Sequence, residues 1–138
     1  MTVLLDTNII MDALQERQPF DVEAKKILRL AQNGREFTCL FTVNAAADIF
    51  YLYSKARDMK SAKAALDFLL TNYGVVAVAR EDCQAALSLS IEDFEDALVV
   101  VCAQKVNANY IITRDEKFLS SISPIKLISP KDFVNTLK

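Results

Sequence analysis

The chain has 138 residues, 52% of them hydrophobic, and a formal net charge of −2, which suits one domain (residues 1–138) with a sizeable core. It contains no histidine, which excludes a Ser-His-Asp triad, a histidine-ligated zinc centre and metal-free RNA cleavage by a histidine pair. The acidic balance argues against binding nucleic acid through simple surface charge, although divalent cations would make an acidic site attractive to phosphate.

In the first half of the chain, short apolar segments alternate with segments of helical periodicity. Turn and capping residues separate them, and Asn33-Gly34 is typical of a helix end. Pro19 follows a turn at Gln18 and is placed to begin a helix. The expected elements are a strand at Thr2–Asp6, helices at Thr7–Gln15 and Phe20–Asn33, a strand at Phe37–Phe41, a helix at Val43–Arg57 capped by Thr42, and a helix at Met59–Tyr73 stopped by Gly74.

The second half continues the alternation. Strands separated by helices imply an α/β fold in which a parallel sheet has helices on both faces, joined by right-handed crossovers. We see no internal repeat and no low-complexity segment. The expected elements are strands at Val75–Val78, Asn109–Thr113 and Lys126–Ile128, helices at Glu81–Leu89 and Asp93–Asn107, and a terminal helix that Pro130 opens.

Three widely spaced cysteines lie among apolar neighbours: Cys39, Cys83 and Cys102. We expect them to be buried, reduced thiols. No apolar run approaches the ~20 residues that span a bilayer, and the N-terminus lacks the basic start and cleavage site of a signal peptide. We therefore expect a cytoplasmic protein without a membrane segment.

Two aspartates follow directly on predicted strands. Asp6-Thr7-Asn8 succeeds the first strand, and Arg114-Asp115 succeeds the strand that ends at Thr113. In open parallel sheets the carboxyl ends of the strands border the ligand crevice, so this pair favours a cation site. The alternative for each is helix capping: Asp6 for the following helix, and Asp115 for a short helix over Glu116–Ser120.

Two more aspartates lie on predicted helices. Asp96 shares one face of a first helical turn with Asp93, and the alternatives are a capping box or a solvated acidic face. Asp48 interrupts a helix that is apolar almost all round and is therefore expected to be largely buried. A lone buried carboxylate is costly unless it is paired or metal-bound, so the alternative for Asp48 is a salt bridge to a distant arginine.

Taken together, these carboxylates form a set of oxygen ligands that suits Mg²⁺ or Mn²⁺. Asn8 and Thr113 can orient the carboxylates through hydrogen bonds. Without histidine or a nucleophilic cysteine, water activated by the metal ion is the natural nucleophile. Four basic residues are candidates for contacts with phosphate, against the alternative of simple solvated charges: Arg114, Lys117, Lys55 and Arg57.

Three segments together resemble the PIN-domain family: Leu4–Ile9, Asp93–Leu98 and Tyr110–Asp115. Their order and spacing span nearly the whole chain. The resemblance implies a three-layer α/β/α fold with a five-stranded parallel sheet. It also implies a metal-dependent endoribonuclease acting on single-stranded RNA. Many bacterial members, often called VapC-like, are toxins of toxin–antitoxin pairs, so an antitoxin and a homodimer are expected partners.

The resemblance also implies a catalytic, metal-binding set of acids, which comprises Asp6, Asp48, Asp96 and Asp115. Asn8 and Thr113 would support these acids, and Asp93 would lie near the site. The helix acid of the family is often glutamate, and Asp48 is one methylene shorter.

Two other interpretations stay open. One is a non-catalytic PIN-fold module that docks a basic partner protein. The other is a phosphatase or phosphoacceptor of another α/β superfamily, which Asn8 disfavours because the haloacid-dehalogenase motif has a second aspartate at that position. Aromatic side chains on the predicted helices belong either to the core or to a homodimer or antitoxin interface; they are Phe50, Tyr51, Tyr53 and Tyr73.

Overall fold

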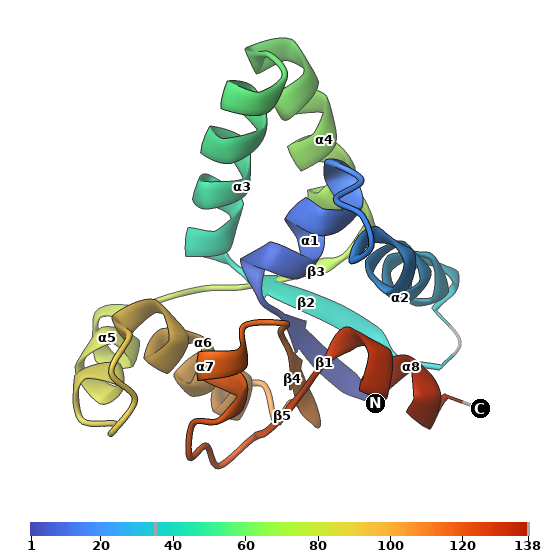
Figure 1. Ribbon diagram of the computed structural model, residues 1–138. Helices are drawn as coiled ribbons and strands as arrows, with labels where there is room; N and C mark the ends of the chain where they lie inside the picture. Colours follow the sequence, from blue (N-terminus) through green and yellow to red (C-terminus); the bar gives the residue numbers. More distant parts are fainter. Residues whose placement is uncertain (35, 138) are drawn as a thin grey trace.

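The computed structural model describes residues 1–34 and 36–137, and a five-stranded parallel sheet lies at its centre (Figure 1). The strand order is β3-β2-β1-β4-β5, and all four neighbouring pairs are parallel. This confirms the predicted sheet. The strands are β1 (Thr2–Leu5), β2 (Thr38–Thr42), β3 (Gly74–Val76), β4 (Tyr110–Ile112) and β5 (Lys126–Ile128).

Helices cover both faces of the sheet, which gives the three layers expected (Figure 1). Helices α1, α2 and α8 pack on one face, and α5, α6 and α7 on the other. Helices α3 and α4 form a hairpin that projects away from the sheet. The bounds are α1 (Thr7–Leu14), α2 (Asp21–Asn33), α3 (Val43–Ala56), α4 (Met59–Asn72), α5 (Arg80–Leu87), α6 (Phe94–Lys105), α7 (Glu116–Leu119) and α8 (Pro130–Thr136).

The strands supply apolar side chains to two separate cores. In β1, Val3 and Leu5 belong to the core under α1 and α2, whereas Leu4 belongs to the core under α6. Successive side chains of a strand point to opposite faces of a sheet, so a continuous apolar run serves both layers. Such runs are typical of parallel strands buried on both sides, as the sequence indicated.

The predicted elements are all present, with bounds that differ from those predicted by at most two residues. Helix α2 begins at Asp21, one residue after the predicted start at Phe20, and Pro19 belongs to the preceding turn, in which the amide of Asp21 donates to the carbonyl of Arg17 at 3.0 Å. Gly34 ends this helix in the left-handed conformation, at φ 70°, as predicted.

Gly74 has a different role from the one predicted. Helix α4 has already ended at Asn72, and Gly74 is the first residue of β3. A Cβ atom at this position would collide with the side chain of Leu40 on the neighbouring strand. A larger residue at position 74 would therefore require the end of the Leu40 side chain to move, and the role of Gly74 lies in β3 and not in helix termination.

The expectation that α3 is largely buried is wrong. Only Ala45 and Ile49 are buried in this helix, and the side chains of Tyr51 and Leu52 are 60% and 39% exposed. The helix packs against α4 and α1 while the hairpin projects from the body, so its remaining surface stays open. The apolar residues of α3 therefore form part of an exposed apolar surface.

Cys39 and Cys102 are buried, as expected, whereas Cys83 is only half-buried on α5. All three thiols are free. Over residues 1–34 and 36–137, none of the helices has the length and apolar character required to cross a membrane.

Candidate functional site

The site forms where β1 and β4 lie side by side and the chain leaves them toward opposite faces of the sheet. Helix α1 follows β1 into one core, and α7 follows β4 into the other. The backbone amide of Asp6 donates to the carbonyl of Ile112 at 3.0 Å, which holds the two strand ends together. A crevice at such a reversal is the usual place for a ligand in open α/β sheets.

Three donors fix the carboxylate of Asp6. The hydroxyl of Thr113 donates to Oδ2 at 2.7 Å, and the side-chain amide of Asn8 donates to the same oxygen at 3.2 Å. The backbone amide of Thr7 donates to Oδ1 at 2.9 Å. Asp6 therefore caps α1, as the capping alternative proposed, but it is also held from a second strand. Thr113 is fully buried and additionally accepts from the amide of Asp115 at 3.2 Å.

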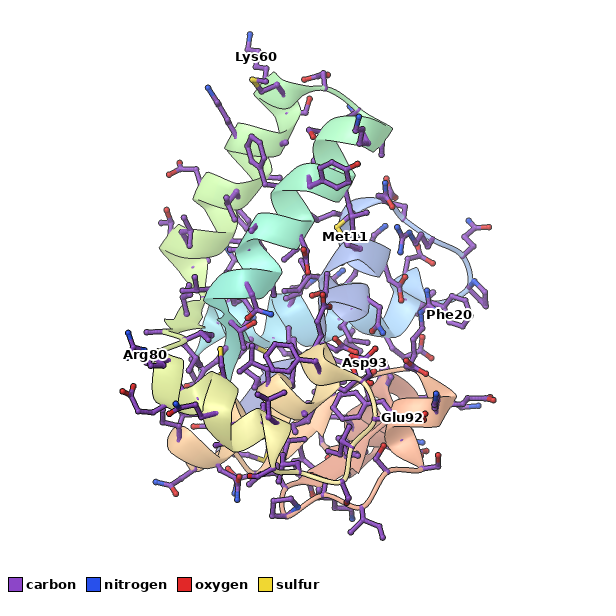
Figure 2. The ribbon with its side chains drawn as sticks, turned by 90° about the vertical axis from the view of Figure 1, so that its left-hand side faces the viewer. Met11, Phe20, Lys60, Arg80, Glu92 and Asp93 are labelled. Carbon is purple, nitrogen blue, oxygen red and sulfur yellow. The ribbon has the colours of Figure 1, made fainter. Side chains whose placement is uncertain are left out.

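An open pocket of about 410 Å³ lies above this strand junction. The structure brings the four predicted acids and Asp93 to it. Figure 2 shows Asp93 below Met11, where the helical hairpin meets the rest of the molecule. The acidic pocket, as we call it, is lined by Asp6, Thr7, Asn8, Met11, Arg17, Asp48, Tyr51, Leu52, Asp93, Glu95, Asp96 and Asp115.

Four secondary-structure elements deliver these acids. Asp93 is the N-cap of α6 and accepts from the amide of Asp96 at 3.0 Å, which leaves the Asp96 side chain in the first turn. Asp115 is the N-cap of α7 and accepts from the amide of Lys117 at 3.0 Å. Asp48 comes from α3, and within the described residues it has no salt bridge, contrary to the alternative of a distant arginine.

Crowding of like charges shifts the titration of the pocket acids. Burial, and then the neighbouring carboxylates of Asp93, Asp6 and Asp115, raise the pKa of Asp96 to about 7. Burial also raises the pKa of Asp6 above its ordinary value, although the hydrogen bonds from Thr113 and Thr7 oppose this. The pKa of Glu95 is raised by burial and by Asp48. The site is therefore strongly acidic.

The donor set fits a hard divalent cation. It consists of carboxylate oxygens, and the buried Oδ1 of Asn8 has no hydrogen-bond partner in the described part of the chain. However, among residues 1–34 and 36–137, no three acidic side chains already stand close enough together to share one ion. The pocket thus supplies the right ligand chemistry, and the side chains would have to converge on a cation.

The four basic residues proposed for phosphate contacts have separate environments. Arg114 is paired with buried Asp12 through two hydrogen bonds, of 2.5 and 3.0 Å, and stacks on Phe20. Lys55 lies over the ring of Tyr51, and Arg57 borders a pocket away from the acids. These three are not among the residues that line the acidic pocket.

Lys117 differs from the other three basic residues. It borders a neighbouring pocket of about 260 Å³ that shares Asp93 and Asp96 with the acidic pocket. Its ammonium group forms an exposed ion pair with Glu92 at 3.3 Å. Lys117 is therefore next to the acids, on the side of α7.

Sequence reasoning missed two charged residues of the pocket. Glu95 belongs to the acidic run before α6, and its place within the first helical turn was the available signal. Arg17 lies between α1 and α2, and no pattern in the sequence indicated that this segment returns to the strand ends.

A family model described as a PIN domain matches residues 2–117. No curated protein matches the chain significantly. A toxin–antitoxin complex from Klebsiella pneumoniae is similar in structure, with a TM-score of 0.69 at 21% identity, over 93% of this chain and 97% of that one.

Two further solved structures are similar at equally low identity. VapBC2 from Rickettsia felis, bound to a promoter DNA fragment, has a TM-score of 0.68 at 20% identity, over 94% of this chain and 98% of that one. VapC20 of Mycobacterium tuberculosis, a toxin that cleaves the sarcin-ricin loop, has a TM-score of 0.68 at 15% identity, over 84% and 92%. These likenesses show a shared fold.

Proposed function

The chain belongs to the PIN domain family, and on that premise we propose that it is an endoribonuclease that hydrolyses single-stranded RNA with Mg²⁺ or Mn²⁺. The observation that carries the proposal is the convergence of carboxylates from β1, α3, α6 and the β4–α7 junction on one pocket. We further propose that it acts in the cytoplasm as the toxin of a toxin–antitoxin pair. VapC proteins among the similar structures support this role.

In this proposal Asp6, Asp48, Asp96 and Asp115 hold the cation. When bound, such an ion supplies positive charge for the phosphoryl group and makes water more acidic. Thr113 and Asn8 keep the Asp6 carboxylate in place by donating to its Oδ2. Asp93 keeps the first turn of α6, and with it Asp96, in place through the backbone amide of Asp96. The reaction adds water to phosphorus and releases a ribose oxygen.

Lys117 is the proposed contact for a phosphate beside the scissile one. Its pocket shares the lining residues Asp93 and Asp96 with the acidic pocket. Its pairing with Glu92 is solvent-exposed on both sides and therefore weak, so a phosphate can replace the carboxylate. Arg114 is not proposed for this role, because its guanidinium group is committed to Asp12.

We propose an antitoxin and a second copy of the chain as protein partners. The projecting hairpin exposes apolar side chains that a protein interface would cover: Tyr51 and Leu52 on α3, and Met59, Phe68 and Leu70 on α4. Complexes of toxin with antitoxin among the similar structures support the first partner.

Cleavage of a panel of labelled single-stranded RNAs tests the proposed activity. We expect cuts with Mn²⁺ or Mg²⁺, none with EDTA, and none for Asp6→Asn, whose fold is checked by circular dichroism. Full activity of Asp6→Asn, or cleavage that EDTA leaves unchanged, would contradict the proposal.

A second candidate function is a non-catalytic module that docks a basic partner segment. The separation of the carboxylates favours it, since no three of those described converge on an ion site. For such a module, Asp6→Asn would weaken binding of an arginine-rich peptide, and no RNA in the panel would be cut with either metal. An enzyme gives the opposite pattern in the cleavage assay.

A further inference from the structure

We infer that Arg17 is a phosphate-binding residue of the acidic pocket and contacts the RNA backbone beside the scissile linkage. This inference rests on the proposed function and assigns a role to the one cationic group among the described lining residues, whose other charged members are all acids. Of the described residues that line the acidic pocket, Arg17 alone carries a positive charge, against six carboxylates. Contacts from arginine and lysine side chains to phosphate fix the position of a nucleic-acid backbone on a protein.

The guanidinium group of Arg17 is available for a ligand. Its nearest acidic partner is Asp12, at 3.7 Å, which is beyond hydrogen-bonding distance. Asp12 already accepts two hydrogen bonds from Arg114, so one buried carboxylate faces two guanidinium groups. The described residues provide no other salt-bridge partner for Arg17, and its side chain is 39% exposed.

The side chain of Arg17 has only the long ion pair with Asp12 among the described residues, whereas its backbone is fixed. Its amide donates to the carbonyl of Asp12 at 3.1 Å, and its carbonyl accepts from the amide of Asp21 at 3.0 Å. The preceding residue, Glu16, has a φ of 51°, a left-handed conformation that few residues other than glycine adopt. The loop thus returns from the end of α1 to the pocket and leads on to Phe20 at the edge of the molecule (Figure 2).

The pocket acids do not capture the Arg17 side chain. None of the six carboxylates lies within ion-pairing distance of it in the described part of the chain. The carboxylate paired with the guanidinium group is that of Asp12, which is buried and does not line the acidic pocket. A planar guanidinium group held in this way can bind two oxygens of one phosphate, which a lysine ammonium group cannot do in the same geometry.

Steady-state cleavage of a labelled single-stranded RNA in Mn²⁺ tests the inference. We compare wild type with Arg17→Gln, Arg17→Lys and the control Arg29→Gln, which changes an exposed arginine on α2 that does not border the pocket. We expect Arg17→Gln to raise KM roughly 10-fold, with a smaller change in kcat, as the loss of one charged hydrogen bond predicts. Arg17→Lys should recover part of this loss, and Arg29→Gln should match wild type.

The salt dependence separates a phosphate contact from a structural role. Loss of one contact to a single strand reduces the slope of log affinity against log salt by about 0.7. A fold defect would lower the melting temperature and leave that slope unchanged. Equal KM and equal slope for wild type and Arg17→Gln would overturn the inference while the proposed ribonuclease stands.

If wild type cuts no RNA, the proposed function fails, and the uncut strand becomes an equilibrium probe. Fluorescence anisotropy of the labelled RNA in Mg²⁺ then decides the role of Arg17. Weaker binding by Arg17→Gln supports the phosphate contact, and equal binding, or no binding by wild type, overturns it.

Discussion

Thr113 donates its hydroxyl to Oδ2 of Asp6 across 2.7 Å, and this bond joins the carboxyl ends of β4 and β1. Thr113 is fully buried, so its position is set by the core beneath it. The acid that begins α1 is therefore oriented by a residue that follows a neighbouring strand and lies 107 positions away in the sequence. A carboxylate that only capped its helix would not need this partner.

Replacing Thr113 by valine tests whether this orientation matters. Thr113→Val keeps the shape of the side chain and removes the donor, so we expect affinity for Mn²⁺ and cleavage at low Mn²⁺ to fall by roughly 10–100-fold. Thr136→Val is the control, because among the described residues the Thr136 hydroxyl donates only to the carbonyl of Phe133 in its own helix α8. Activity of Thr113→Val equal to that of the control would show that the bond has no role in the site.

Removing Arg114 should destabilise the fold. Arg114→Gln leaves the buried carboxylate of Asp12 with only the distant guanidinium group of Arg17, and we expect a loss of about 2–4 kcal/mol in urea unfolding. The exposed pair between Lys117 and Glu92 provides the comparison, since Glu92→Gln should cost less than about 1 kcal/mol. Equal effects of the two substitutions would contradict a structural role for Arg114.

The raised pKa of Asp96 predicts a pH-dependent stability in metal-free buffer. The pKa of Asp96 is about 7 in the folded protein, against the ordinary value of 3.8 for the unfolded chain. At a pH between these two values the folded protein therefore holds a proton that the unfolded chain has lost. Its contribution to stability is therefore lost as the pH rises from about 4 through 7. Asp96→Asn should be more stable than wild type at pH 8, by on the order of 1 kcal/mol.

This difference in stability should shrink at pH 5, where Asp96 is protonated in the folded wild type. Thermal unfolding with EDTA at both pH values measures it. If Asp96→Asn were less stable than wild type at pH 8, the crowding of carboxylates around Asp96 would be refuted.

Substitutions of Asp48 test whether its side chain is long enough to bind the cation, because a glutamate often occupies the corresponding helix position in the family. We expect Asp48→Asn to reduce cleavage by at least the roughly 100-fold that loss of an orienting group can cause, and Asp48→Glu to retain more activity. Rates with saturating Mn²⁺ separate the two variants. Equal activity of Asp48→Asn and wild type would remove Asp48 from the ligand set.

The elements that place Asp6 and Asp115 could be predicted because the information is local. An apolar strand that ends on a polar group and turns into a helix is visible over a few residues, and parallel order brings such ends to one edge. The sequence also predicted that Thr113 orients a carboxylate through a hydrogen bond. Which carboxylate accepts this bond depends on the pairing of β1 with β4, which brings Thr113 to Asp6.

The parts that could not be predicted depend on how distant segments pack. The apolar character of α3 suggested burial, but the helix belongs to a projecting hairpin and exposes Tyr51. Arg17 reaches the pocket only because its loop folds back along α1. Arg114 follows a strand end just as Asp6 and Asp115 do. However, its guanidinium group donates to the buried carboxylate of Asp12 and does not line the acidic pocket.

We propose that acids from four secondary-structure elements together bind Mg²⁺ or Mn²⁺. Calorimetric titration of Mn²⁺ into wild type and into Asp6→Asn, Asp48→Asn, Asp96→Asn and Asp115→Asn tests it most directly, with Asp67→Asn on the outside of α4 as the control. We predict stoichiometric binding by wild type and the control, and weakened or abolished binding by each of the other four. Absence of binding by wild type, or binding that survives unchanged in all four variants, would contradict the claim.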